Sequence, residues 1–325
     1  MSAIMNEAKE LMKLWGGFRA SRVLLTANNY RVFDFLTKAI SAKEISKRLK
    51  TDIRATEILL DALTGIGLLK KHKNIYSNAP LASKFLVSGK PYYQGDILRH
   101  ANTLWQNWSG LDEVMKTGKP YRKAHDHKSF ILGMHNLALL KAKDIVKQIG
   151  LKGIKTALDL GGGPGTYSIE MAKNGVDVTL FDRPETVEIA KRIVNNSPQP
   201  PLNLRGGINF IQGDFINDNI GNGYDLIFAS QILHSGSEKD NIQLLKKCRK
   251  ALNRGGRMVI QEFYILKDRA HPLPGALFSV NMLVNTPGGR CYSPDEMKKW
   301  LLKAGFKKTE EKVLGDTVLV QAVNK

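Results

Sequence analysis

The alternation of hydrophobic and polar positions changes its period near residue 155. Before that point apolar residues recur mainly at helical spacing, whereas after it short apolar runs of strand length are separated by helix-compatible segments. The strand candidates of this second part are residues 155–160, 176–182, 208–214, 224–230 and 257–265. Strands that alternate with helices predict an α/β domain with a largely parallel sheet.

The N-terminal part predicts a winged-helix arrangement. A helix is expected at 42–49, where Ser41 is a candidate N-cap, and a second one at about 54–65. Two short strands, at 68–69 and 75–77, follow on either side of a basic turn.

The middle of the chain is predicted to be mostly helical, over residues 101–117 and 128–149. We therefore divide the chain into three parts. A winged-helix domain covers residues 1–95, a helical linker that contributes to a substrate pocket covers 96–150, and the α/β domain covers 151–325.

A glycine-rich turn opens the α/β domain. Asp159 and the glycines Gly161, Gly163 and Gly165 stand directly after one strand candidate and before a helix. Glycine allows backbone to approach a ligand closely and to take positive φ. The third glycine of the dinucleotide fingerprint G-x-G-x-x-G is missing, which weakens a nicotinamide oxidoreductase interpretation.

Acidic residues end the next two strand candidates. Asp182 stands where a carboxylate can accept hydrogen bonds from both hydroxyls of a ribose. Asp214 is placed to accept from the amino group of an adenine, with Phe215 against the ring. A turn followed by two such acids favours a nucleoside cofactor over a purely structural turn.

With these residues identified, residues 10–325 resemble the plant-type and bacterial small-molecule O-methyltransferases. Helix residues FILGM (130–134) are similar to the segment that lays a methionine over the reaction site. The other matching stretches are TALDLGGGPG (156–165), LFDRP (180–184), GDF (213–215), SQILH (230–234), VIQEF (259–263), NTPGG (285–289) and KAGF (303–306).

The resemblance implies a class I, Rossmann-like methyltransferase sheet of seven strands, with a mostly helical winged-helix dimerisation domain. Its antiparallel last strand agrees with the hairpin that the strand candidates 306–313 and 317–323 suggest. The resemblance further implies S-adenosylmethionine as the cofactor, an intertwined homodimer, and a small-molecule methyl acceptor. The implied cofactor-binding residues are Asp159, Gly161, Gly163, Asp182, Asp214, Phe215 and Ser230.

His234 is the candidate general base. A hydroxyl acceptor must lose its proton on methylation, and histidine is suited to take it near neutral pH. His234 follows the strand candidate 224–230, at the edge where an open α/β sheet binds ligands. In the resembled family this position is the base, and Glu262 matches one of two glutamates beside it. Cys291 holds the place of the second glutamate.

The resemblance also implies a substrate pocket lined by Met134, Met282, Asn285 and Cys291. As isolated residues the methionines would be core, and Cys291 is better explained as a small pocket-lining residue than as a nucleophile. We expect methylation of a hydroxyl on an aromatic or related small molecule. Two alternatives stay open. The stretch QILHSGSE (231–238) is similar to the bacteriochlorophyllide C-methyltransferases, which suggests C-, N- or S-methylation of a tetrapyrrole or quinone, and Cys291 leaves open a non-catalytic homologue that binds the cofactor.

The chain has 49 basic and 30 acidic residues, a formal net charge of +19. Such a charge can attract nucleic acid, an anionic membrane or an acidic small molecule, or merely reflect a lysine-rich solvated surface. The candidate recognition helix, 54–65, sets Arg54 against Glu57 and Asp61, which does not suit a phosphate-lined groove. Nucleic acid is therefore an improbable partner.

Composition and spacing limit the remaining possibilities. No apolar run approaches the roughly 18 residues of a membrane span. Two cysteines, Cys248 and Cys291, make no disulfide framework, so we expect a cytoplasmic protein. Neither the histidines at 125 and 127 nor the aspartates at 214 and 218 have the spacing of a metal site, and no metal is expected.

Overall fold

The computed structural model describes residues 3–195 and 205–325. The chain divides into two compact units, Met1–Thr103 and Leu104–Lys325. The boundary between them lies inside the segment 96–150 that the sequence suggested as a linker, so the division into three parts stays a prediction.

The first unit is built from short helices and a small antiparallel sheet of order β1-β3-β2. Its strands are β1 (Ile40–Ser41), β2 (Leu69–His72) and β3 (Ile75–Asn78). The helices before residue 90 are α1 (Ala3–Gly16), α2 (Phe18–Asn29), α3 (Val32–Phe35), α4 (Ala42–Leu49), α5 (Ile53–Gly65) and α6 (Pro80–Phe85).

Side-chain caps explain where the two predicted helices of this unit begin. The Ser41 hydroxyl accepts from the Glu44 amide at 3.2 Å at the start of α4, and Asp52 accepts from the Ala55 amide at 2.7 Å before α5. The basic turn predicted at 70–74 is shorter than expected. His72 pairs with Ile75, so most of the predicted turn belongs to β2.

The two long helices predicted in the middle of the chain are each interrupted. The first becomes α7 (Gly95–Trp108) and α8 (Leu111–Thr117), and the second becomes α9 (His127–Leu139) and α10 (Ala142–Ile149). The first interruption lies at Gly110, where the Tyr121 ring occupies the space that a Cβ atom would need. At the second, Lys141 leaves helical geometry with φ −136°.

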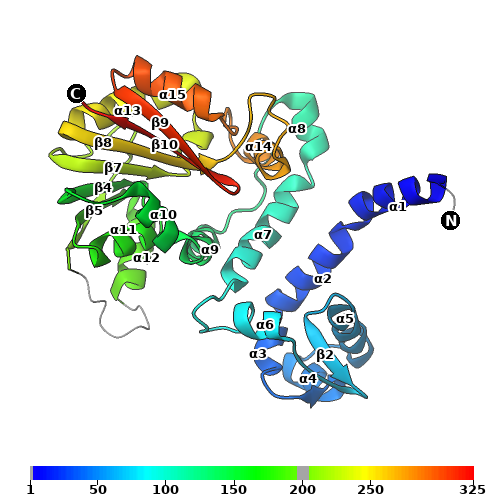
Figure 1. The fold of residues 1–325 in the computed structure, drawn as a ribbon. Helices are drawn as coiled ribbons and strands as arrows, with labels where there is room; N and C mark the ends of the chain where they lie inside the picture. The colour runs from blue at the N-terminus through cyan, green and yellow to red at the C-terminus, as the bar shows by residue number, and fades with distance from the viewer. Residues whose placement is uncertain (1–2, 196–204) are drawn as a thin grey trace. The chain divides into compact units, whose positions relative to one another are not determined.

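The second unit contains a seven-stranded sheet of order β6-β5-β4-β7-β8-β10-β9 (Figure 1). The strands are β4 (Thr156–Leu160), β5 (Asp177–Asp182), β6 (Ile208–Gln212), β7 (Tyr224–Ser230), β8 (Leu252–Phe263), β9 (Lys307–Leu314) and β10 (Thr317–Val323). The first five strands of this order pair in parallel, and β10 is antiparallel to both β8 and β9. The predicted sheet with its antiparallel last strand is confirmed.

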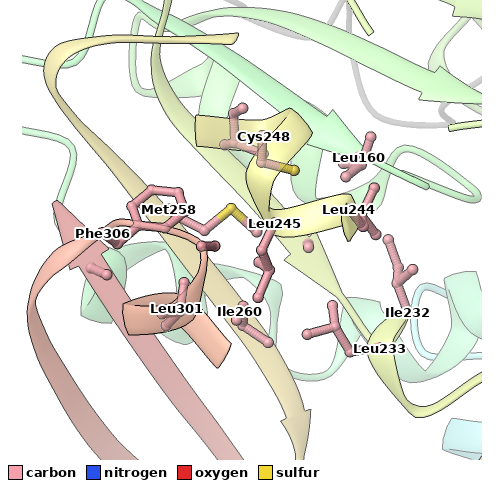
Figure 2. Packing of buried hydrophobic residues seen from close by; sticks show 14 of the residues in the cluster. Leu160, Ile232, Leu233, Leu244, Leu245, Cys248, Met258, Ile260, Leu301 and Phe306 are labelled. Atoms are coloured by element: carbon pink, nitrogen blue, oxygen red, sulfur yellow. The ribbon is translucent and has the colours of Figure 1, made fainter. Parts of the chain in front are cut away.

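Helices cover both faces of this sheet (Figure 1). Consecutive residues of β4 point to opposite faces: Ala157 packs in the core beneath α10 and α11, and Leu158 in the core beneath α13 and α15. Figure 2 shows this second core, in which Cys248, Met258 and Phe306 meet. The remaining α-helices of this unit are α11 (Thr166–Lys173), α12 (Pro184–Asn195), α13 (Glu238–Ala251), α14 (Leu273–Asn285) and α15 (Pro294–Lys303).

Among the described residues, every helix is too short or too polar to cross a membrane. 

Phe306 provides a test of the second core. Its side chain is fully buried, so Phe306→Ala leaves a cavity between α15 and the sheet. We expect a loss of about 3–5 kcal/mol in the free energy of unfolding, measured by urea denaturation. The control Leu302→Ala, on an exposed position of α15, should change it by about 0.5 kcal/mol at most. Equal effects of the two variants would contradict this packing.

Candidate functional site

The register of the parallel strands brings the predicted site residues to one edge of the sheet. Leu160, the last residue of β4, lies opposite Phe181 of β5 and opposite Ala229 of β7. Ser230 lies opposite Gln261 of β8. The glycine turn, Asp182, Ser230 and Glu262 therefore follow or end neighbouring strands at the carboxyl edge, where open α/β sheets bind ligands.

The first two glycines of the turn are packed against neighbouring side chains that leave no room for a Cβ atom. The amide of Gly161 donates to the carbonyl of Phe181 at 2.8 Å, which holds the turn against β5. A Cβ atom on Gly161 would lie 2.6 Å from Ile232 Cδ1, and one on Gly162 would lie 2.8 Å from Leu180 Cγ. Gly161 also has a φ of +63°, which strains any other residue.

Asp182 closes the turn from the end of β5. Its Oδ2 accepts from the Gly163 amide at 2.8 Å, and its Oδ1 accepts from the Arg183 amide at 2.7 Å. Burial raises the pKa of Asp182, and these two amide donors act in the opposite direction. The Thr186 side chain also donates to this carboxylate, so three of its roughly four acceptor sites are used and Asp182 can still accept a hydrogen bond from a ligand.

Asp159 is a buried carboxyl group whose hydrogen bonding is incomplete. Its Oδ2 accepts from the Ser168 hydroxyl at 2.6 Å, whereas its Oδ1 has no partner among the described residues. Burial raises the pKa of Asp159 to about 6, against the hydrogen bond from Ser168 and with help from the negative charge of Asp182. The site thus contains a desolvated acid that a cationic ligand would stabilise.

Asp214 and Phe215 lie in the turn that follows β6. Phe215 Cε1 is 3.5 Å from the Cβ position of Gly161, so its ring stands beside the glycine turn. The Asp214 carboxylate accepts from the Ile216 amide at 2.9 Å and from the Asn217 side chain at 2.7 Å. Ser230, at the end of β7, donates its hydroxyl hydrogen to Gln261 at 3.0 Å.

His234 and Glu262 form a nearly buried pair. The Nδ1 atom of His234 is 2.8 Å from Glu262 Oε2, and the His234 backbone amide donates to Glu262 Oε1 at 3.3 Å. The histidine side chain is 13% exposed and the glutamate side chain 3%. Because Glu262 engages Nδ1, the remaining ring nitrogen, Nε2, carries the free lone pair of the neutral histidine.

Two phenylalanines that the sequence did not indicate form a wall beside this pair. The rings of Phe263 and Phe278 stack with centroids 3.8 Å apart, and the His234 ring meets Phe278 edge-on at 4.9 Å. Phe263 directly follows Glu262 in β8, so its place in the sequence could have identified it as a residue near the site. Phe278 lies on α14, a helix that the hydrophobic pattern did not reveal.

The predicted substrate residues are placed in different surroundings. Cys291 is buried, and burial raises the pKa of its thiol to about 11, with the charge of Glu262 acting in the same direction, so the group is a neutral thiol at physiological pH. Met282 is buried on α14, and Met134 is half-buried on α9. The Asn285 amide bonds within the protein, accepting from Asn107 at 2.9 Å and donating to the Asn281 carbonyl at 2.8 Å.

His135 is a further residue that the sequence did not single out. On α9, its Nδ1 is 2.8 Å from the hydroxyl of Thr166, the first residue of α11. Burial lowers the pKa of His135 to about 4, so the ring is neutral and serves as a hydrogen-bonding contact between the helices. Across the described ranges, no group of three or more His, Cys, Asp or Glu side chains is arranged to hold a metal ion.

Comparison with known families agrees with this geometry. Residues 92–307 match the O-methyltransferase domain, and residues 12–88 match the O-methyltransferase dimerisation domain. The chain belongs to the O-methyltransferase family. It is a methyltransferase that depends on S-adenosylmethionine.

Individual relatives extend over nearly the whole chain. The chain is 30% identical over 311 residues to 3-hydroxy-5-methyl-1-naphthoate 3-O-methyltransferase of Streptomyces sahachiroi, covering 91% of this chain and 88% of the relative. It is 30% identical to acetylserotonin O-methyltransferase of Gallus gallus, covering 92% of each. The structure of human N-acetylserotonin methyltransferase in complex with SAM superposes with a TM-score of 0.88 at 25% identity, covering 99% of each chain.

The residues present fit the cofactor of this family. S-adenosylmethionine carries a sulfonium and an ammonium group, and the unpartnered Oδ1 of Asp159 offers a buried negative charge to a cation. The ribose hydroxyls are hydrogen-bond donors, and the Asp182 carboxylate retains acceptor capacity for a donor from the ligand. At Gly163 a Cβ atom would meet only the Gly161 carbonyl oxygen, at 4.0 Å, so this part of the turn leaves its backbone open to a ligand.

The raised pKa of Asp159 leads to a prediction about pH. A carboxyl group whose pKa rises on folding from about 3.9 to about 6 destabilises the folded state as pH rises through that interval. In ligand-free protein at pH 8, Asp159→Asn should therefore raise the free energy of unfolding by on the order of 3 kcal/mol, and this gain should shrink towards pH 4. Denaturant titrations at several pH values measure it.

The same variant should bind S-adenosylmethionine more weakly at pH 8 in calorimetry, because the cation loses its buried carboxylate. A variant that is less stable than the wild type at every pH would contradict the account of Asp159.

Proposed function

We propose that this protein methylates a hydroxyl group of an aromatic small molecule, with His234 as the general base. The observation that carries the proposal is the buried His234–Glu262 pair at the carboxyl edge of the sheet, with Nδ1 2.8 Å from the carboxylate. When bound, S-adenosylmethionine supplies an electrophilic methyl group on a sulfonium.

The cofactor-binding residues follow the order of the strands. Asp182 accepts from the ribose hydroxyls, and Asp214 accepts from the adenine amino group while the Phe215 ring packs against the base. Asp159 and the backbone of Gly161 and Gly163 hold the methionine end and the adenosyl group, with Ser230 beside them. In support, Phe215 and Asp182 both contact the glycine turn.

The chemistry assigned to His234 follows from its hydrogen bond. Glu262 accepts from Nδ1–H and thereby fixes the tautomer in which Nε2 is a base. Nε2 takes the proton of the acceptor hydroxyl as its oxygen becomes a nucleophile. Glu262 then stabilises the imidazolium cation, and its low exposure strengthens this interaction.

The surroundings of His234 favour a planar aromatic acceptor. The stacked rings of Phe263 and Phe278 provide a flat apolar wall next to the base. Met134 and Met282 are polarisable residues that we assign to the rest of the acceptor pocket. Two relatives whose names state aromatic hydroxyl acceptors, a hydroxynaphthoate and acetylserotonin, support the same class.

Cys291 keeps a second reaction class open. As a neutral thiol it adds no negative charge beside His234, so Glu262 alone supports the imidazolium. An acceptor that needs less help to lose its proton, or a carbon, nitrogen or sulfur acceptor on a tetrapyrrole or quinone, fits this reduced charge.

We infer a homodimer from the dimerisation-domain match over residues 12–88. Helix α1 and the residue that opens α2 present large apolar side chains to solvent, which a second copy would bury. Those at least half exposed are Ile4, Leu11, Met12, Leu14, Trp15 and Phe18. The cytoplasmic location stays a prediction.

His234→Ala tests the base. Without Nε2 the acceptor hydroxyl keeps its proton, so turnover with a hydroxynaphthoate should fall by roughly 10²–10⁴-fold. Affinity for S-adenosylhomocysteine, measured by calorimetry, should change little because His234 is not assigned to the nucleoside.

The matched control is His271→Ala, because His271 also pairs with a carboxylate, Asp268, at 2.8 Å but is exposed. Turnover of the control should equal that of the wild type. Undiminished turnover of His234→Ala would remove the base assignment.

A further inference from the structure

One lysine ties α13 to the loop that follows β6. The ammonium group of Lys247 donates to three backbone carbonyls, those of Phe215 at 2.8 Å, Ile216 at 2.6 Å and Asp218 at 2.9 Å. An ammonium group has three donors, and here each has its own acceptor. Three carbonyl dipoles that point at one place repel each other unless a cation lies between them, so Lys247 stabilises this particular loop conformation.

The helix that carries Lys247 is itself firmly held. On the same helix, Leu244, Leu245 and Cys248 are buried in the core against the sheet (Figure 2). Its first turn begins with a capping box, in which Ser237 and Asp240 satisfy each other's backbone amides. Through its three hydrogen bonds, Lys247 therefore fixes the loop after β6 relative to a helix that is itself held firmly.

The loop has its own internal bonds, but they fix other groups. The Asp218 carboxylate accepts from the Asp214 amide at 2.8 Å, and the Asp214 carboxylate accepts from the Ile216 amide at 2.9 Å. These bonds satisfy amides, whereas Lys247 satisfies carbonyls. The Lys247 side chain on α13 thus supplies the donors for loop carbonyls that the loop's own bonds do not satisfy.

This loop carries the two residues that we assign to the adenine. Phe215, whose carbonyl Lys247 holds, directs its ring to within 3.5 Å of the Cβ position of Gly161. We propose that Lys247 is a positioning residue that sets the adenine-binding loop against the glycine turn, and so determines affinity for the adenine part of the cofactor. The inference rests on the proposed cofactor contacts of Asp214 and Phe215.

The test compares two ligands that differ in the adenine. Lys247→Met removes the donors but keeps the length of the side chain, and Lys247→Arg keeps a cationic donor. Lys246→Met is the matched control, because Lys246 is the exposed neighbour on the same helix. Calorimetry measures the Kd of S-adenosylhomocysteine and of S-ribosylhomocysteine, which lacks the base, for all variants and the wild type.

We expect Lys247→Met to raise the Kd of S-adenosylhomocysteine about tenfold while changing that of S-ribosylhomocysteine less than about twofold. Lys247→Arg should recover most of the loss, and Lys246→Met should match the wild type. In steady-state assays the KM for S-adenosylmethionine should rise and kcat should stay within about twofold.

Two results would overturn the inference: an unchanged Kd for S-adenosylhomocysteine in Lys247→Met, or equal losses for both ligands, which indicate a general structural role. Wild-type protein without affinity for S-adenosylhomocysteine would instead contradict the proposed function itself, so the two failures are distinguishable.

Discussion

The parallel register of β5, β4, β7 and β8 is the constraint on which the site depends. Because these strands run in the same direction and each ends within two residues of its neighbour, the residues that follow them meet at one edge. The glycine turn can then bond to the end of β5, and His234 can reach Glu262 on β8. A slip of one residue in β8 would turn Glu262 to the other face of the sheet and leave His234 without its carboxylate.

Two buried carboxyl groups give this edge its chemical character, and they differ in how their charge is compensated. Glu262 has a partner within the protein, since both of its oxygens accept from His234. Asp159 is compensated only by Ser168, and its Oδ1 has no hydrogen-bond partner among the described residues. In the function that we propose, one acid supports the base and the other attracts a cationic cofactor. Burial of the Asp159 carboxylate lowers the free energy of unfolding of the ligand-free protein, and binding of the cationic cofactor would compensate for this loss.

The sequence allowed most of the sheet and its site to be predicted, because the relevant signals are local. Apolar runs mark the strands, and Asp182 and Ser230 end two of them. Features that depend on contacts distant in sequence were not predictable. The Tyr121 ring packs against Gly110 from eleven residues further on, and the wall beside His234 depends on Phe278, whose helix α14 is apolar over most of its surface. Lys247 belongs to the same class, since its acceptors lie about thirty residues away.

The most direct test is a crystal structure of the protein with S-adenosylhomocysteine and a hydroxylated aromatic acceptor. The account predicts the nucleoside along the carboxyl edge, with adenine against Phe215, ribose hydroxyls on Asp182, and the acceptor hydroxyl between the sulfur and Nε2 of His234. A nucleoside bound elsewhere, or an acceptor hydroxyl that faces away from His234, would contradict it.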